Sequence, residues 1–523
     1  MRIFPAEIPH FLYLCILYIE IMTPAIVIAT IAAYIAALFA VAFVAGRRAD
    51  NAGYFSGNRR MPWVVTAASM VSAAMSGVSF ISVPGSVAVS NFSYLQMVVG
   101  FIVGYLVIAF VLVPLYYRYN VTSLYEYLKS RFGVKSQLSG AWFFLISRTL
   151  LSALRAYVAC TVLQLLVFES LGIPFEVNAI LFMALVWLYS HRGGVRTIIW
   201  TDILRTLVLV GSLGITIALI TKVEGLSFGQ MLTAIADHPF SRTLFTDDWN
   251  DSRHLVKQLL AGVFMVIAMT GLDQDMMQRT LSCRSKSDAQ KNLVVGVLLQ
   301  SVVIVLFLSL GVLLYMHLAS VGITPSEGTL FPMTDSSGQA LIDKADHVFP
   351  FVATAGSLPI AVGVLFVLGL IASTYSASGS ALTALTTSFT IDILRGRERL
   401  NEERLTAVRQ RVSLGMALLS TLLIILFDRI SNSSAIDTFY SVASYSYGPL
   451  LGMFAFGICT KRVVNERWIP AVVVSAPLLA WLLDHFSEHL FGGYQFGFEI
   501  LIINALLTMV GMSFISKKAT TNN

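Results

Sequence analysis

The sequence predicts an all-α, polytopic membrane protein. Of its 523 residues, 56% are hydrophobic and 12% are charged, whereas soluble domains carry about 25% charged residues. Apolar runs of the roughly 20 residues that a bilayer requires recur along the chain, and basic residues are concentrated in the short loops between them. This distribution of basic residues is typical of cytoplasmic loops. The net charge of +6 therefore gives no support for nucleic-acid binding.

We predict thirteen membrane-spanning helices from these runs. They cover residues 24–46, 62–85, 95–117, 140–169, 176–191, 196–222, 255–273, 292–317, 352–390, 412–429, 438–460, 468–484 and 498–515. Lys and Arg fall in alternate loops, and the opposite loops hold none of them near residues 86–94, 170–175, 430–437 and 485–497. Because basic loops stay on the cytoplasmic side, the amino terminus is predicted outside and the carboxyl terminus inside.

Residues 1–21 fit this pattern poorly. The apolar run at residues 8–23 is short, contains Glu20, and lacks the basic leader and cleavage site of a signal peptide. Met22 stands directly before the first good span. Residues 1–21 are therefore predicted to be a start-site extension or a disordered outer tail, and residues 22–61 to hold the first helix and an inner loop.

The ten helices that follow divide into two groups of five. Residues 62–222 form the first group and residues 255–460 the second, with an outer loop at 223–254 between them and two peripheral helices and a short cytoplasmic tail in 461–523. Five is an odd number, so the second group must enter the membrane from the opposite side, as in an inverted-topology repeat. Such repeats usually place the binding site between their first helices.

Both of these first helices carry signals of interruption. Gly77 and Pro84 weaken the first one, and Gly271 lies beside Asp273 in the second. An unwound segment frees carbonyls and helix ends, which suit a small cation or a carboxylate. A glycine in a membrane helix can also serve packing alone, so the matching position of the two interruptions is what favours a binding site.

Residues 371–390 carry no charge but many hydroxyls. Those of Ser373, Ser376, Ser380, Thr383 and Thr387 recur every three or four residues and form one stripe on a helix. The stripe either lines an ion or substrate path, or consists of hydroxyls that bond to the carbonyl one turn earlier and join neighbouring helices.

Six short motifs lie in order along the chain. They are Tyr54–Trp63 (YFSGNRRMPW), Thr122–Gly133 (TSLYEYLKSRFG), Gly193–Gly194 with Trp200–Asp202, Gly271–Gln274 with Gln278–Leu281, Phe389–Asp392 and Tyr447–Gly452. In this order they resemble the sodium:solute symporter family over about residues 24–515. The resemblance implies a core of two inverted five-helix repeats of the leucine-transporter (LeuT) type.

The resemblance also implies a sodium site between the first broken helix and the hydroxyl-rich helix. Its ligands would be the carbonyls of Ser72, Met75 and Ser373 and the hydroxyl of Ser376. Oxygen ligands of this kind suit a hard cation. Ala377 stands where sodium-coupled members usually have a second Ser or Thr, so the ion would bind weakly, or water or a neighbouring hydroxyl would replace the missing oxygen.

Asp202 is a carboxylate within a span, which is costly and indicates either a role in function or a structural cap near the inner helix end. The resemblance implies a place on the inner release path and, in some members, at an additional sodium site. Because Ala377 would spoil that additional site, we expect a single sodium ion, with Asp202 on its path.

The substrate cavity is expected between the two broken helices and the third and fourth spans. Ser76, Ser79 and Gln96 offer neutral hydrogen bonds there. Arg148 and Arg155 are seven residues apart and share one helix face. Arg155 lies nearer mid-depth, where a substrate carboxylate is a candidate partner, whereas Arg148 is expected to reach the lipid headgroups at the inner surface.

Sugar-carrying branches of the family place amide and aromatic side chains around the pocket, and some use a Lys. The matching positions here are Ser79, Val266, Met269 and, for the Lys, Gln300. This composition favours an organic anion, such as a monocarboxylate or a sugar acid, over a neutral hexose.

The sequence thus predicts a sodium-coupled symporter of the cell (inner) membrane that imports a small organic solute by alternating access. A sodium-independent uniporter or channel-like facilitator is the alternative that Ala377 leaves open. A membrane sensor is a further alternative, which the few residues after the last span disfavour. No phosphate-binding glycine loop or nucleophile elbow suggests an enzyme. Sodium is expected as the coupling ion without a cofactor, and the oligomeric state is left open.

Overall fold

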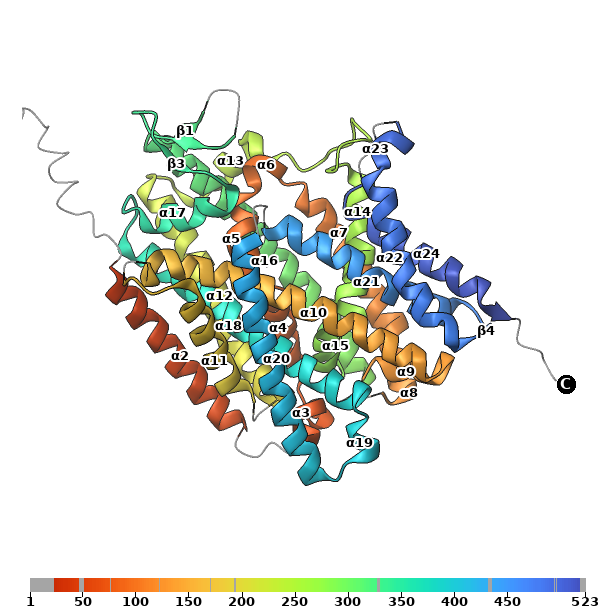
Figure 1. The fold of residues 1–523 in the computed structure, drawn as a ribbon. Helices are drawn as coiled ribbons and strands as arrows, with labels where there is room; N and C mark the ends of the chain where they lie inside the picture. The colour runs from red at the N-terminus through yellow and green to blue at the C-terminus, as the bar shows by residue number, and fades with distance from the viewer. Residues whose placement is uncertain are drawn as a thin grey trace, which may run out of the picture.

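The computed structural model describes residues 23–46, 51–75, 77–121, 123–169, 171–191, 194–326, 330–430, 435–492, 494 and 496–517. The predicted extension at residues 1–21 lies outside these ranges. The described chain is a bundle of helices with short strands near its two ends, as Figure 1 shows.

The helices are α2 Pro24–Gly46, α3 Asn51–Ser56, α4 Trp63–Ala74, α5 Gly77–Gly85, α6 Val87–Ser90, α7 Tyr94–Val107, α8 Val113–Tyr119, α9 Tyr125–Phe132, α10 Val134–Leu163, α11 Phe175–Ser190, α12 Gly194–Val223, α13 Phe228–Asp237, α14 Leu255–Val266, α15 Gln274–Thr280, α16 Lys286–Ser320, α17 Val348–Thr354, α18 Ile360–Ser388, α19 Gly396–Arg399, α20 Glu402–Ile430, α21 Ala435–Cys459, α22 Ile469–His485, α23 Ser487–Leu490 and α24 Ile500–Phe514. The strands are β1 Thr324–Pro325, β2 Met333–Thr334, β3 Ala340–Ile342, β4 Val463–Val464 and β5 Ser516–Lys517, paired antiparallel in the orders β1-β2-β3 and β4-β5.

Long apolar helices account for most of the predicted spans. Within the described residues, 9 helices are long and apolar enough to cross a membrane, or up to 11 if each of two bent pairs is one span. The shorter apolar helices α11 and α24 lie at two further predicted positions. Every predicted span therefore has a helix, a bent pair or a short apolar helix at its place.

The prediction of one continuous helix at residues 352–390 is wrong. The structure divides this segment into α17, which ends at Thr354, and α18, which begins at Ile360. Gly356 has a positive φ of 82°, and Pro359 precedes the first residue of α18. Proline lacks an N–H and disfavours a helical conformation in the residue before it, so the helix stops although the run stays apolar.

Burial separates central from peripheral helices. In the most apolar stretches of α10 and α18, 72% and 71% of the residues are buried, whereas in those of α2, α20 and α22 the share is 22% each. The first two therefore form the centre of the bundle, and the other three expose apolar faces of the kind that lipid covers. In Figure 1, α10 crosses the middle of the molecule and α2 lies at its edge.

Helices α7 and α14 contact each other through their backbones. A Cβ added to Gly100 would overlap the Leu259 carbonyl oxygen, and one added to Gly262 would overlap the Met97 carbonyl oxygen. Only glycine permits such close contact between two backbones in a membrane protein. These two positions therefore fix α7 directly against the first half of the second broken helix.

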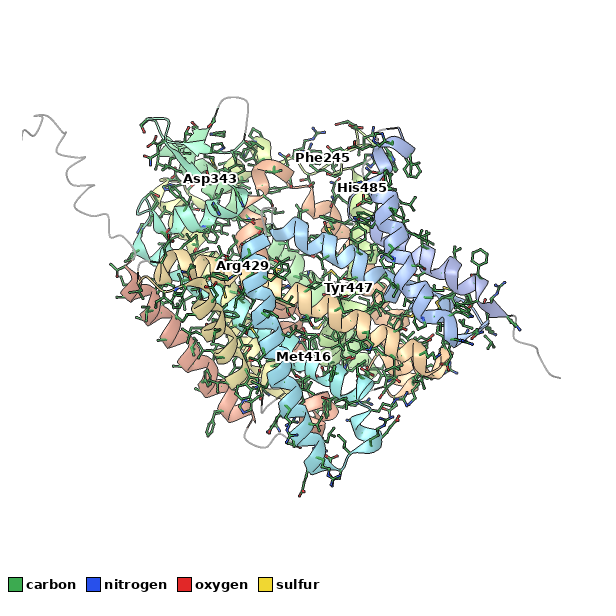
Figure 2. All side chains as sticks on the ribbon, in the orientation of Figure 1. Phe245, Asp343, Met416, Arg429, Tyr447 and His485 are labelled. Atoms are coloured by element: carbon green, nitrogen blue, oxygen red, sulfur yellow. The ribbon has the colours of Figure 1, made fainter. Side chains whose placement is uncertain are left out.

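Segments predicted on the same side of the membrane lie together. On the inner side, Lys129 in α9 pairs with Glu398 in α19 at 2.7 Å, and Arg131 donates to the Gly457 carbonyl at 3.2 Å. On the outer side, His317 lies 2.6 Å from Glu224. Figure 2 shows the outer residues Phe245, Asp343 and His485 at one end and Tyr447 in the interior.

Candidate functional site

Two helices break near the middle of the bundle. The first consists of α4 and α5, bent by 59°, and the second of α14 and α15, bent by 72°. Met75 is extended at the first break, with φ −88° and ψ 124°, and a π-helical turn at Ile267–Gly271 precedes the second. The interruptions predicted at Gly77 and Gly271 are thus present, whereas Pro84 lies inside α5 without ending it.

The carbonyls at the second break have protein partners. The Tyr116 hydroxyl donates to the Gly271 carbonyl at 2.8 Å, and the Tyr125 hydroxyl donates to the Leu272 carbonyl at 3.2 Å. Asp273 caps α15 by accepting the Met276 N–H at 3.2 Å. These groups are satisfied as burial requires.

The first break lies directly against α18. A Cβ on Gly77 would overlap the Thr374 hydroxyl and would stand 3.6 Å from the Ser373 hydroxyl oxygen. Ser72 is fully buried, and its hydroxyl has no hydrogen-bond partner among the residues that the structure describes. The Met75 carbonyl accepts a hydrogen bond from Arg205. The side chain of Ser376 and the whole of Ser76 lie outside what the structure describes.

Most hydroxyls of the predicted stripe bond within α18. That of Ser373 donates to the Leu370 carbonyl at 2.8 Å, that of Thr383 to the Gly379 carbonyl at 3.0 Å, and that of Thr387 to the Thr383 carbonyl at 2.8 Å. Ser380 differs, because it donates to Asp275 and accepts from Arg279. The stripe is thus largely self-satisfied, with one hydroxyl in a charged cluster.

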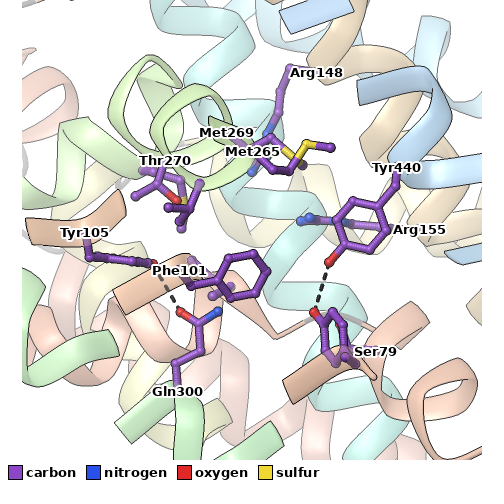
Figure 3. A pocket seen from close by; sticks show the side chains of 15 residues that line it. Ser79, Phe101, Tyr105, Arg148, Arg155, Met265, Met269, Thr270, Gln300 and Tyr440 are labelled. Carbon is purple, nitrogen blue, oxygen red and sulfur yellow. Dashed lines mark hydrogen bonds between the residues drawn. The ribbon is translucent and has the colours of Figure 1, made fainter. Parts of the chain in front are cut away.

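A cavity of about 70 Å³ lies between the two broken helices. Ser79, Arg155 and Met269, all predicted as substrate contacts, line it (Figure 3). Further lining residues are Ala73, Ala74, Tyr94, Phe101, Tyr105, Arg148, Met265, Val266, Thr270, Met276, Gln300 and Tyr440. The cavity wall therefore combines apolar and aromatic side chains with two arginines and neutral polar groups from Ser79, Thr270, Gln300 and three tyrosines.

Gln96, predicted as a substrate contact, is not among the lining residues. Its side-chain N–H donates to the Arg253 carbonyl at 2.8 Å, and its side-chain oxygen accepts the Phe245 N–H at 3.3 Å. The amide therefore anchors the long outer loop to the start of α7. This corrects the prediction, and the reason is that an outer-loop segment far along the sequence satisfies the buried amide.

Two tyrosines separate the cavity from the outside. The hydroxyls of Tyr94 in α7 and Tyr440 in α21 lie 2.9 Å apart. Both residues line the central cavity and also an outer cavity of about 180 Å³. The Phe101 ring packs edge-on against Tyr94 at 6.1 Å. This pair could not be predicted from the sequence, because no local pattern indicates that α7 and α21 meet.

A chain of buried charges lies on the inner side of the cavity. Arg279 contacts Asp275 at 2.6 Å and Asp202 at 3.2 Å, and Asp202 lies 3.8 Å from Arg205. Arg148 pairs with Asp275 and, at 3.5 Å, with Asp273. The chain is tied to further elements, since Tyr447 in α21 donates to Asp273 at 2.5 Å and Ser69 in α4 donates to Asp202 at 2.5 Å.

This chain corrects the expectation for Arg148 and specifies the environment of Asp202. Arg148 is 3% exposed and ion-paired, so it does not reach the headgroups. Asp202 is fully buried and accepts the Ser69 hydroxyl at 2.5 Å in addition to its arginine partners. The pairing escaped sequence analysis because Arg148 and Asp275 are 127 positions apart.

Sequence comparisons with known proteins all indicate the same family. The family model of the sodium:solute symporter family matches residues 54–467. The sodium/sialic acid symporter SiaT of Proteus mirabilis is 28% identical over 84% of this chain and 86% of its own length. The sodium/sialic acid symporter NanT of Aliivibrio fischeri is 25% identical over 91% of each chain.

Solved structures show the same fold. A sodium-coupled sialic acid symporter in a substrate-bound, outward-open state has a TM-score of 0.76 with 21% identity, covering 94% of this chain and 99% of its own. Mhp1, a nucleobase-cation-symport-1 family transporter in a closed conformation, has a TM-score of 0.57 with 14% identity, covering 88% and 94%.

Proposed function

Because the chain belongs to the sodium:solute symporter family, we propose that its solute is a small organic anion, a carboxylate or sugar acid. Family membership makes the protein a multi-pass membrane transporter coupled to sodium, not an enzyme. The observation that carries the proposal is a buried arginine, Arg155, in the wall of the central cavity. Two relatives named as sodium/sialic acid symporters support the same class of solute.

Arg155 is suited to hold a carboxylate. Its side chain comes from α10 at the centre of the bundle, is 8% exposed, and extends beside Tyr440 (Figure 3). Arg148, the other arginine of the cavity, has carboxylate partners in Asp273 and Asp275. A planar guanidinium binds a carboxylate through two parallel hydrogen bonds. We assign Arg155 to the solute carboxylate and the neutral groups of Ser79 and Gln300 to the rest of the solute.

The cavity is contracted. Its volume of about 70 Å³ is well below the roughly 300–1,000 Å³ of typical ligand sites. A sugar acid therefore enters only when the wall moves outward, and the Tyr94–Tyr440 contact stands between the cavity and the outer face. Closure above by these tyrosines and below by the buried charges is the arrangement that alternating access requires.

Sodium is assigned to the first break, with the carbonyls of Ser72, Met75 and Ser373 and the hydroxyl of Ser376 as ligands. The donor set fits a hard cation, because it is made of oxygens. The unpartnered, buried Ser72 hydroxyl adds a further oxygen at this break. Asp202 lies on α12, beside α4, where it accepts the Ser69 hydroxyl. We assign it to the inner sodium path.

Replacing the Ser376 hydroxyl tests this sodium site. Ser376→Ala is expected to raise the sodium concentration for half-maximal uptake at least tenfold, since a lost ligand to an ion costs about 1.5–3 kcal/mol. Ser147→Ala is the matched control, because that hydroxyl donates to the Phe143 carbonyl one turn earlier in α10. Equal sodium dependence in the two variants would remove the site.

Removing the Tyr94 hydroxyl tests the outer closure. Tyr94→Phe keeps the ring and deletes the hydrogen bond to Tyr440, a net loss of about 0.5–1.5 kcal/mol for the closed state. The half-saturating solute concentration is expected to fall up to about tenfold. Tyr494→Phe, at an outer-face tyrosine that donates to Glu499 at 2.9 Å, should leave it unchanged. An unchanged value in Tyr94→Phe argues against a closing role.

The solute class is tested by uptake into proteoliposomes. The panel is sialic acid, a short monocarboxylate and glucose, each with an inward sodium gradient and with choline in its place. Accumulation of one of the acids under the sodium gradient, with glucose excluded, is the expected result. Accumulation of glucose in preference to the acids would overturn the anionic solute, and equal accumulation in choline would indicate the facilitator instead.

A further inference from the structure

Arg205 holds one of the carbonyls assigned to sodium. It lies on α12, is fully buried, and donates through Nη2 to the Met75 carbonyl at the first break. Its Nε and Nη1 have no hydrogen-bond partner among the described residues. Buried polar groups are normally hydrogen-bonded, so these two nitrogens leave the guanidinium able to take a further partner.

A second position for the guanidinium is close by. Arg205 Nη1 lies 3.8 Å from Asp202 Oδ1, which belongs to the residue three positions earlier on the same helix. Asp202 also contacts Arg279 at 3.2 Å and Ser69 at 2.5 Å. A side-chain rotation of Arg205 toward Asp202 would release the Met75 carbonyl without moving α12.

Sodium and the Arg205 guanidinium cannot both bind the Met75 carbonyl without weakening each other's interaction. Both are positive, and the site is buried, where repulsion between like charges is weakly screened. A carbonyl freed at a break within the bilayer also needs a partner when sodium is absent. Arg205 supplies that partner, and it must withdraw before the ion can take its place.

We infer that Arg205 is a tethered competitor of sodium, which holds the Met75 carbonyl in the ion-free protein and turns toward Asp202 when the ion binds. The inference rests on the proposed sodium site. It implies that Arg205 weakens sodium binding. It also implies that Arg205 keeps the Met75 carbonyl hydrogen-bonded while the ion-free transporter changes back to its outward-facing conformation.

Sodium binding without solute tests the inference. The melting temperature of the purified full chain in detergent is measured against sodium concentration, with choline holding the ionic strength constant, because binding to the folded state raises it. Arg205→Gln is expected to lower the half-effect sodium concentration at least tenfold. Arg205→Lys, which keeps the charge, should stay within about threefold of the wild type.

Arg196→Gln is the matched control, since Arg196 is a partly buried arginine on the same helix. It should leave the sodium dependence unchanged. Arg205→Met replaces the glutamine variant if that variant does not give a monodisperse protein. Sodium dependence of solute uptake, measured on the same variants, is expected to shift in the same direction.

The outcomes separate this inference from the proposed function. A wild type that responds to sodium together with an Arg205→Gln variant of equal or weaker response would overturn the inference alone. A response that appears only in Arg205→Gln would support occupation of the site by Arg205 and overturn sodium coupling in the wild type. The absence of any response in all variants would overturn both.

Discussion

Arg155→Gln is expected to reduce sodium-driven uptake of the acidic solute at least 100-fold. The substitution leaves a carboxylate in a buried cavity without its cationic partner, which costs about 3–5 kcal/mol, and each 1.4 kcal/mol is a factor of ten. The loss should appear mainly as a higher half-saturating solute concentration, measured as initial uptake into proteoliposomes over a wide solute range.

Two further variants isolate the cause. Arg429→Gln removes an arginine whose side chain is 71% exposed and pairs with Glu176 at 3.4 Å, so uptake should be unchanged. Arg155→Lys keeps the charge but loses the planar fork and should retain part of the uptake. If Arg155→Gln transports the acid with wild-type affinity, the assignment of the carboxylate to this arginine is wrong.

Asp275→Asn is expected to lower the free energy of unfolding by about 3–5 kcal/mol, because Arg148 and Arg279 both lose a charged partner in the interior. The fall should be seen as a lower melting temperature in detergent. Asp275 also accepts the Ser380 hydroxyl, so the inner closure loosens along with the fold.

Asp288→Asn is the control for this change. Asp288 lies in the first turn of α16 and is only partly buried, so its substitution should alter stability by no more than about 1 kcal/mol. A melting temperature of Asp275→Asn equal to that of Asp288→Asn would show that the buried chain does not stabilise the protein.

The spans were predictable from sequence because a bilayer allows few alternatives. Backbone groups must be satisfied within a segment, so a long apolar run becomes a helix. The error at residues 352–390 arose because hydropathy does not register a break inside an apolar run. There the local effect of Pro359 and the positive φ of Gly356 ends one helix and begins another.

The candidate site was only partly predictable. Arg155 and Ser79 were placed at the cavity through motifs and helix spacing, and the structure has both in its wall. Gln96 was misplaced, and the Tyr94–Tyr440 pair was missed, because each depends on a contact between segments far apart in the chain. Sequence spacing within one helix carries no information about such contacts.

The backbone contact at Gly100 and Gly262 limits how the transporter can move. At these two positions no side chain separates α7 from the first half of the second broken helix, so we expect the two to slide or tilt together. They belong to opposite halves of the sequence. This backbone contact therefore opposes a rocking motion of the amino-terminal half against the carboxyl-terminal half. The group of helices that moves during transport must include elements from both halves.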